Sequence, residues 1–145
     1  MLSYEELEQA NAAIRTTNIK GKEYAEVNQR VKAFRMCFPD GCIKTTMVSN
    51  EGGVCVFKAE VFSEYKVDEV TPDDAYSLAK LLATGWAYEK EGSTYINKTS
   101  YIENCETSAV GRALGFAGFG IDTSIASAEE VMNAQLNQPL EKKYI

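Results

Sequence analysis

A helix rich in small residues is the feature that most constrains how this chain can fold. Residues 97–122 read NKTSYIENCETSAVGRALGFAGFGID. Ser100 and Glu103 have the spacing of a capping box, which predicts that a helix begins at Tyr101. Glycine readily adopts the left-handed conformation that terminates helices, so the helix should end near residues 118–120.

The small residues of this helix need a physical reason, because glycine weakens a helix. Gly111 and Gly115 each cost an α-helix about 1 kcal/mol relative to alanine. Ala109, Ala113 and Ala117 repeat the same spacing of four. Small side chains let a helix backbone approach another surface closely, so we expect packing against a sheet or a neighbouring subunit. The charges in so short a segment exclude a membrane helix pair.

Three segments before this helix have the composition of β-strands. Residues 42–48 and 54–62 are rich in β-branched and aromatic side chains, and the intervening SNEGG can close a hairpin. Residues 81–91 have the pattern of a third strand. Consecutive strands of this kind favour an antiparallel meander.

Three further segments have helical patterns. Residues 3–14 are amphipathic, and residues 23–37 carry one apolar stripe. A last helix is expected from residue 128 to about residue 137, behind a second capping box that starts at Ser127. The predicted fold is therefore α+β: a curved antiparallel sheet of three or more strands packed by helices, with a β-β-β-α core.

Length and composition match one ordinary globular domain. The chain has 145 residues, of which 45% are hydrophobic and 25% charged. We expect residues 1–137 to form a single domain and residues 138–145 a flexible C-terminal tail. No apolar run has the length of a membrane helix, and the acidic start of the sequence is unlike a signal peptide. These features predict a cytoplasmic location without membrane contact.

The absence of histidine removes several classes of enzyme. Catalytic arrangements built on Ser-His-Asp or Cys-His are impossible in a sequence without histidine. The sequence also has no P-loop motif for ATP. Its four cysteines lack the spacing of a metal site. A binding protein without metal or cofactor is therefore a stronger interpretation than an enzyme.

The charges are unevenly distributed along the chain, whose net charge is −6. Residues 20–44 contain six basic and three acidic side chains, whereas residues 51–74 contain seven acidic and two basic ones. A local positive field can attract a polyanion even when the total charge is negative. Ordinary solvated surfaces explain both segments equally well.

Three blocks of the sequence resemble the phage and prophage single-strand annealing proteins of the Rad fifty-two-like superfamily of recombination mediators. The most similar group is a small phage family formerly described only as a domain of unknown function. The blocks are KGKEYAEVNQRVKAFR, AYEKEGSTYINKTSYIENCETSAVGRALGF and GIDTSIASAEEV, which cover most of residues 20–131. In the first, Arg30 and Val31 match an Arg-Val pair of the mediators. In the second, Arg112 matches a basic residue of the mediators' DNA groove, whereas Gly111 stands in place of a lysine.

The resemblance implies ATP-independent binding and annealing of single-stranded DNA in phage recombination. The DNA would lie in a basic groove on a ring or filament of subunits. The implied partners are single-stranded DNA, further copies of the chain and a single-strand DNA-binding protein. Cations would contact phosphates without sequence preference, and Tyr88, Tyr95 and Tyr101 could stack on bases. The candidate DNA-binding residues are Arg30, Arg112, Lys22, Lys32, Arg35, Lys90, Lys98 and Tyr101.

Two other functions are compatible with the sequence. The chain could be an oligomeric interaction protein that recruits replication or recombination partners through residues 51–74 and binds DNA only weakly. It could also be a small metal-dependent nuclease. The acidic residues available for a nuclease site are Glu89, Glu91, Glu103 and Glu106.

Overall fold

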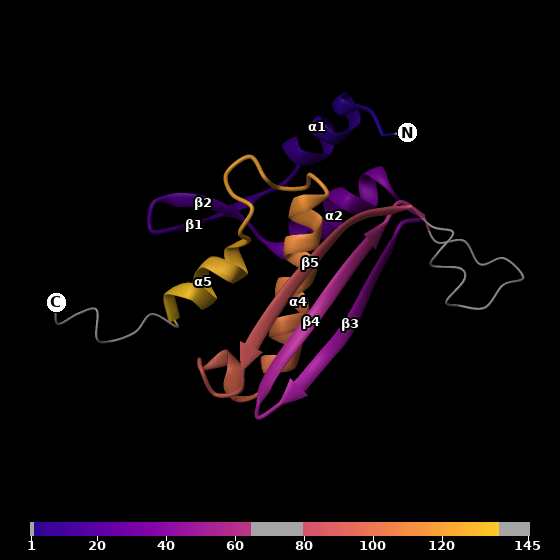
Figure 1. Ribbon diagram of the computed structural model, residues 1–145. Coiled ribbons are helices and arrows are strands. Elements are labelled where there is room, and N and C mark those ends of the chain that lie inside the picture. The colour runs from indigo at the N-terminus through magenta and orange to yellow at the C-terminus, as the bar shows by residue number, and fades with distance from the viewer. Residues whose placement is uncertain (1, 65–79, 137–145) are drawn as a thin grey trace, which may run out of the picture.

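Two sheets and a set of helices make up the computed structural model, which describes residues 2–64 and 80–136 (Figure 1). The predicted tail, residues 138–145, and much of the acidic segment 51–74 lie outside the described residues. The elements in chain order are α1 (Tyr4–Ala12), β1 (Thr16–Ile19), β2 (Lys22–Ala25), α2 (Val27–Cys37), β3 (Cys42–Glu51), β4 (Val54–Phe62), β5 (Leu81–Lys90), the 3₁₀-helix η1 (Ile96–Lys98), α4 (Tyr101–Phe116) and α5 (Ala128–Leu136).

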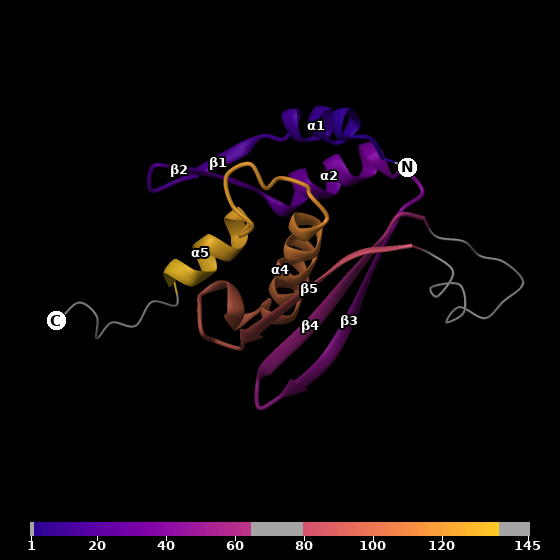
Figure 2. The same ribbon diagram turned by 45° about the horizontal axis from the view of Figure 1, so that its top comes forward.

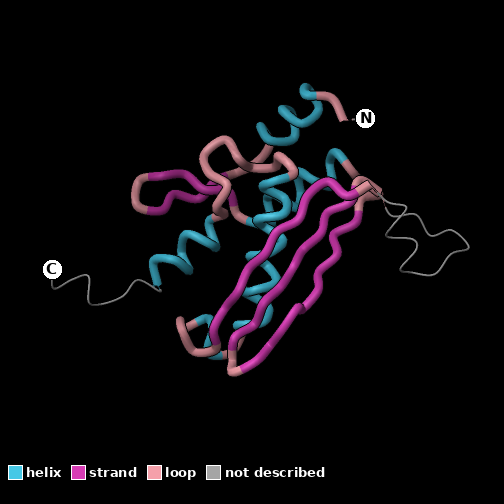
Figure 3. The backbone as a smooth tube through the Cα atoms, in the orientation of Figure 1, coloured by secondary structure: helices cyan, strands magenta, loops and turns pink. Residues whose placement is uncertain are grey.

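The larger sheet is antiparallel with the strand order β3-β4-β5 (Figure 3). This confirms the predicted α+β class and the meander of three strands. Residues along β4 alternate between the two faces, as expected for a strand with one covered face. Cys55, Phe57, Ala59 and Val61 are buried, and the residues between them are half-buried.

Helix α4 covers one face of this sheet, and no described helix covers the opposite face (Figures 1 and 2). The core lies between the sheet, α4 and α2. Phe34 of α2 meets Phe119 edge to face, with the ring centroids 5.8 Å apart. Leu114 of α4 is also fully buried. Among the described residues, no helix is both long and apolar enough to cross a membrane.

The small residues of α4 allow it to lie directly against its neighbours, as the sequence predicts. A side chain at Gly85 of β5 would overlap the backbone of Ala109 and Ala113, so the helix touches the strand there. On another face of α4, a Cβ at Gly111 would lie 2.7 Å from Val27, and one at Gly115 would lie 2.8 Å from Arg30. The alanines therefore seat α4 on the sheet, and the glycines seat it against α2.

The hairpin of β1 and β2 was not expected from the sequence. Its two-residue turn has positive φ angles at Lys20 (50°) and Gly21 (87°), which is the geometry of a type I′ turn. Because β2 pairs with β1 over Lys22–Ala25, helix α2 begins only at Val27. The prediction of a helix from residue 23 is therefore wrong at its start.

The two predicted capping boxes have different outcomes. Ser127 Oγ accepts a hydrogen bond from Glu130 N across 3.3 Å, as expected for an N-cap. Helix α4 begins at Tyr101 as predicted, but the side chain of Ser100 makes no capping hydrogen bond. Sequence spacing therefore located both helix starts, although it gave the correct cap chemistry at one of them.

Candidate functional site

Arg30, which the sequence predicts as a DNA contact, is fully buried. Its Nη1 donates to the carbonyl oxygen of Gly111 at 2.8 Å, and its Nη2 donates to those of Gly120 and Ser124 at 3.0 Å each. Burial lowers the pKa of Arg30, and nearby glutamate carboxylates oppose that shift. The structure corrects the predicted role: Arg30 joins α2 to α4 and to the loop that follows, and offers no surface to a phosphate.

Arg112 is half-exposed and already has an acidic partner. Its Nη1 lies 3.0 Å from Glu130 Oε2 of α5, and its guanidinium carbon lies 5.3 Å from the centroid of the Phe116 ring. The ion pair fixes the side chain between α4 and α5. Arg112 therefore reaches the surface as a cation whose charge is partly balanced.

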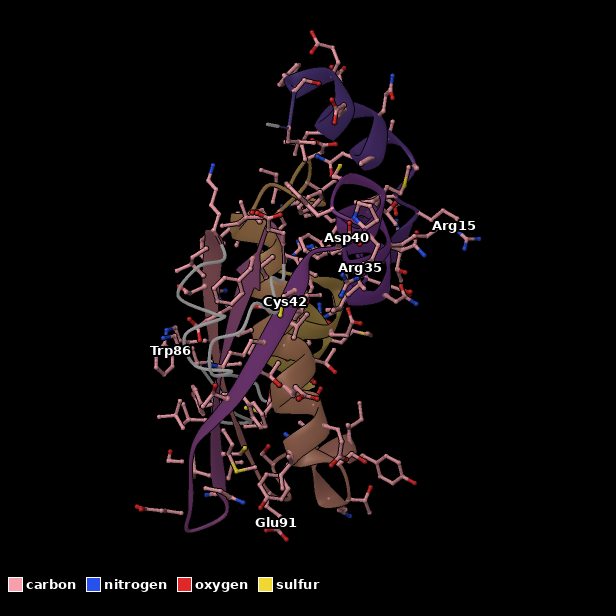
Figure 4. All side chains as sticks on the ribbon, turned by 90° about the vertical axis from the view of Figure 1, so that its right-hand side faces the viewer. Arg15, Arg35, Asp40, Cys42, Trp86 and Glu91 are labelled. Carbon is pink, nitrogen blue, oxygen red and sulfur yellow. The ribbon has the colours of Figure 1, made fainter. Side chains whose placement is uncertain are left out.

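The other predicted residues are spread over several elements. Lys22 lies on β2, Lys32 and Arg35 on α2, and Lys98 in η1, and all four are exposed. Arg35 lies on a different side of the molecule from Trp86 (Figure 4). Arg35 therefore does not share one basic groove with the residues of β5.

Tyr101 is half-buried at the start of α4, and its hydroxyl donates to Asn50 Oδ1 at 3.2 Å. This bond ties the helix start to the end of β3. A tyrosine held in this way is less free to stack on a base than an unattached surface tyrosine.

An aromatic and basic strip lies on the open face of the sheet. We use the name aromatic strip for Trp86, Tyr88 and Lys90 of β5 together with Lys58 of β4. Trp86 is 50% exposed and Tyr88 is 73% exposed. Lys58 is paired with Trp86 in the strand register, and its Nζ lies 5.8 Å from the centroid of the Trp86 ring. Figure 4 shows Trp86 projecting from the face of the sheet opposite α4.

Trp86 and Lys58 were missed at the level of sequence. A period of two was available as a signal, since Trp86, Tyr88 and Lys90 occupy every second position of the predicted strand 81–91. Alternation places these three side chains on one face. Alternation does not show which of the two faces α4 covers. The three residues are exposed because α4 packs on the other face.

A groove runs along the free edge of β5, between this strand and α5. We call it the edge groove; its volume is about 530 Å³. Strand β5 supplies one wall, and Figures 1 and 2 show α5 beside that strand. The lining residues that concern its chemistry are Trp86, Tyr88, Lys90, Ser108, Arg112, Glu130 and Asn133.

A hydrogen-bonded carboxyl group forms part of the same lining. Glu89 of β5 is 7% exposed and accepts bonds from Asn97 Nδ2 at 2.8 Å and from Asn133 Nδ2 at 3.3 Å. Burial raises the pKa of Glu89, although the hydrogen bond from Asn97 opposes the shift. Of the eight candidate DNA-binding residues, Lys90 and Arg112 line this groove. Glu89 and Glu130 line it as well, so the groove is not a basic channel.

The fold and this surface define a small α+β domain whose sheet presents exposed aromatic side chains and cations to a ligand. The model of one protein family matches residues 31–117, from α2 to the end of α4. The chain belongs to this family, which is described as Slr1353 N-terminal dsRNA-binding domain-like. The description is that of a nucleic-acid-binding type of domain. No curated protein and no solved structure matches the chain significantly.

This family assignment corrects the resemblance to phage single-strand annealing proteins, which is wrong. The matched range begins at Val31, one residue after Arg30, and includes the whole second pattern around Arg112. The structure gives those residues another reason to be present. Arg30 holds backbone carbonyls, and Gly111 and Gly115 make room for Val27 and Arg30. The pattern therefore reflects how α2 packs on α4 and not a DNA groove.

Proposed function

We propose that this domain is a binding protein, not an enzyme, and that it holds nucleic acid with unpaired bases on the open face of its sheet. The observation that carries this function is the pair of exposed aromatic rings, Trp86 and Tyr88, on one face of β5. Side chains two residues apart along a strand lie about 7 Å apart, so each ring can receive a separate base. Stacking on an aromatic side chain contributes about 1–3 kcal/mol per base.

Two lysines of the aromatic strip can contact the phosphates that accompany these bases. Lys58 lies beside Trp86 and 3.9 Å from the Glu60 carboxylate, which balances part of its charge, and Lys90 ends strand β5. Few cations and a net charge of −6 favour weak, salt-sensitive binding without base preference on the strip itself. Four further properties remain predictions from the sequence, and binding on this face does not depend on them. They are strand annealing, self-assembly, a single-strand DNA-binding protein as partner and a cytoplasmic location.

Duplex RNA is a second candidate ligand, because the family description names a double-stranded-RNA-binding type of domain. Such domains recognise shape and backbone over about 16 base pairs. The exposed cations Lys22, Lys32 and Lys98, which are not part of the strip, could serve that purpose. Duplex bases are stacked on one another, so this mode of binding would leave Trp86 without a base.

The fluorescence of Trp86 can distinguish the two ligands, since Trp86 is the only tryptophan of the chain. The protein would be titrated with a single strand of about 12 nucleotides and with duplex RNA that contains the same strand. Strong quenching by the single strand, with little by the duplex, is expected. Duplex binding detected by anisotropy without quenching would favour the second candidate. Failure of both ligands to bind at low salt would reject both.

A further inference from the structure

We infer that the edge groove is a pocket for one unpaired nucleobase at the end of the aromatic strip, and that it prefers guanine to thymine or uracil. This assignment rests on the proposed function, and it adds a specific subsite to a face that otherwise binds without base preference. Trp86 and Tyr88 belong to both the strip and the lining of the groove. A strand that stacks on these rings therefore passes directly over the mouth of the groove.

The size of the groove suits a base with part of its sugar. Its volume of about 530 Å³ falls within the range of roughly 300–1,000 Å³ that small-molecule sites occupy. Its walls come from separate elements, β5, α4 and α5. Arg112 and Glu130 join two of these walls across 3.0 Å, so this ion pair links α4 to α5 within the lining of the groove.

Two buried polar atoms of the lining residues have no hydrogen-bond partner within residues 2–64 and 80–136. They are Ser108 Oγ and Glu130 Oε1. Ser108 is only 4% exposed, and buried polar groups of native proteins are almost always paired. Ser108 is also one of the residues that line the groove. Unpaired groups of this kind are expected where a ligand completes the hydrogen bonding.

The chemistry of these atoms favours a base with an N–H donor that is not flanked by two carbonyl oxygens. Arg112 occupies Glu130 Oε2, which leaves Oε1 as an acceptor without a donor. A carboxylate can only accept hydrogen bonds, whereas the Ser108 hydroxyl can do either. Guanine presents two adjacent N–H donors on its Watson–Crick edge. Thymine and uracil present one N–H between two carbonyl oxygens, which the carboxylate repels.

A neighbouring amide is already oriented by the protein. Asn133 is 6% exposed, and its Nδ2 donates to Glu89 Oε1 and to Asn104 Oδ1, at 3.3 Å each. Its position is therefore set before any ligand arrives. Enzymes that read an extruded base combine the same two contacts: aromatic stacking and hydrogen bonds to the Watson–Crick edge.

The test uses thymine oligonucleotides of about 12 residues that carry a single central guanine, adenine or cytosine. Affinity is measured from Trp86 quenching for the wild type, Ser108→Ala and Glu130→Gln. Ser100→Ala, at the residue that precedes the same helix, is the control, because Ser100 lies outside the groove lining. Circular dichroism confirms that each variant is folded at the temperature of the titration.

We expect the guanine oligonucleotide to bind the wild type about tenfold more tightly than the all-thymine one. Ser108→Ala and Glu130→Gln should each reduce this ratio at least severalfold while all-thymine affinity is retained, and Ser100→Ala should keep the ratio. Equal affinity for all four oligonucleotides, or a ratio unchanged in both groove variants, would overturn the guanine pocket but leave the proposed function intact. Absence of binding by every oligonucleotide would overturn both.

Discussion

Arg30 Nη1 donates a hydrogen bond of 2.8 Å to the carbonyl oxygen of Gly111. This bond joins helix α2 to the middle of α4, at residues 81 positions apart in sequence. One helical turn later, Gly115 has no side chain, and a Cβ there would lie 2.8 Å from the guanidinium. The arginine and the glycine therefore depend on each other: the cation occupies the volume that the glycine leaves free.

Replacing Arg30 by methionine should destabilise the fold strongly. Three backbone carbonyls would lose their donor in the interior, so the free energy of unfolding should fall by about 2–4 kcal/mol. Urea unfolding followed by circular dichroism measures the change. Lys32→Met is the matched control, because Lys32 is an exposed cation of the same helix. Equal losses in the two variants would contradict the structural role of Arg30.

Gly85→Ala should separate α4 from β5. The added methyl group would overlap the backbone of Ala109 and Ala113, and backbone atoms cannot rotate out of the way. We expect a loss of about 1–3 kcal/mol in unfolding free energy, measured by thermal or urea unfolding. Thr84 is a half-buried residue one position earlier, on the opposite face of the strand. Thr84→Ala should change stability much less. Wild-type stability of Gly85→Ala would show that the helix can move away freely.

Tyr88→Ala should weaken the binding of single-stranded nucleic acid by about 1–3 kcal/mol, because one stacking surface is lost. Fluorescence anisotropy of a labelled oligonucleotide measures this. Tyr95 provides a close comparison: it is 84% exposed but lies in the loop after β5 rather than on the sheet face. Tyr95→Ala should bind almost as the wild type does. If both tyrosines matter equally, the strip is not the binding surface.

Lys90→Ala should reduce the salt dependence of binding. Each phosphate contact to a single strand contributes a slope of about 0.7 in log affinity against log salt, so the loss of one contact should flatten the plot by that amount. Lys22→Ala, on the β1–β2 hairpin, should leave the slope unchanged. The opposite pattern would place the phosphates on the hairpin side of the molecule.

Titration of Glu89 should make the fold less stable as pH rises. Burial raises its pKa in the folded state above the value of 4.5 for an unperturbed carboxyl, so the folded protein binds this proton more strongly than the unfolded chain. The stability that this proton contributes is complete below the unfolded pKa and is lost as pH rises through the folded pKa.

Glu89→Gln removes that titration. The unfolding free energy of the variant, relative to the wild type, should increase as pH rises above 4.5, the pKa of an unperturbed carboxyl. Urea unfolding at several pH values measures the difference, with the exposed Glu91→Gln as a control for the loss of one charge. A constant difference across this range would show that Glu89 does not titrate differently on folding.

The sheet and α4 could be predicted from sequence because their signals are local. β-Branched and aromatic runs indicated β3 and β4, and the spacing of small residues in α4 predicted its close approach to a sheet or a neighbouring subunit. The β1–β2 hairpin was missed because its turn, Lys20-Gly21, lacks the Asn-Gly or Asp-Gly pair that usually identifies a type I′ turn. Lysine rarely adopts a positive φ by its own preference, so the conformation of Lys20 is imposed by the hairpin around it.

The candidate site was harder to predict, since it depends on contacts between distant residues. Arginine is rarely buried without a partner, and the partners of Arg30 are carbonyls at residues 111, 120 and 124. Backbone carbonyls are present at every residue, so no pattern of side chains in the sequence identifies the ones that bind Arg30. Trp86 was missed for a related reason: its strand was predicted, but only the packing of α4 shows which face of that strand is open.

The three carbonyls that hold Arg30 also set the order in which the chain can complete its fold. All of them lie at least 81 residues further along the sequence. During synthesis from the N-terminus, α2 emerges long before any of these acceptors. Arg30 therefore cannot bind all three carbonyls until residue 124 has been synthesised. Burial of this one cation therefore requires residues 111, 120 and 124 to be present, and a chain that stopped before them would lack the acceptors that hold Arg30.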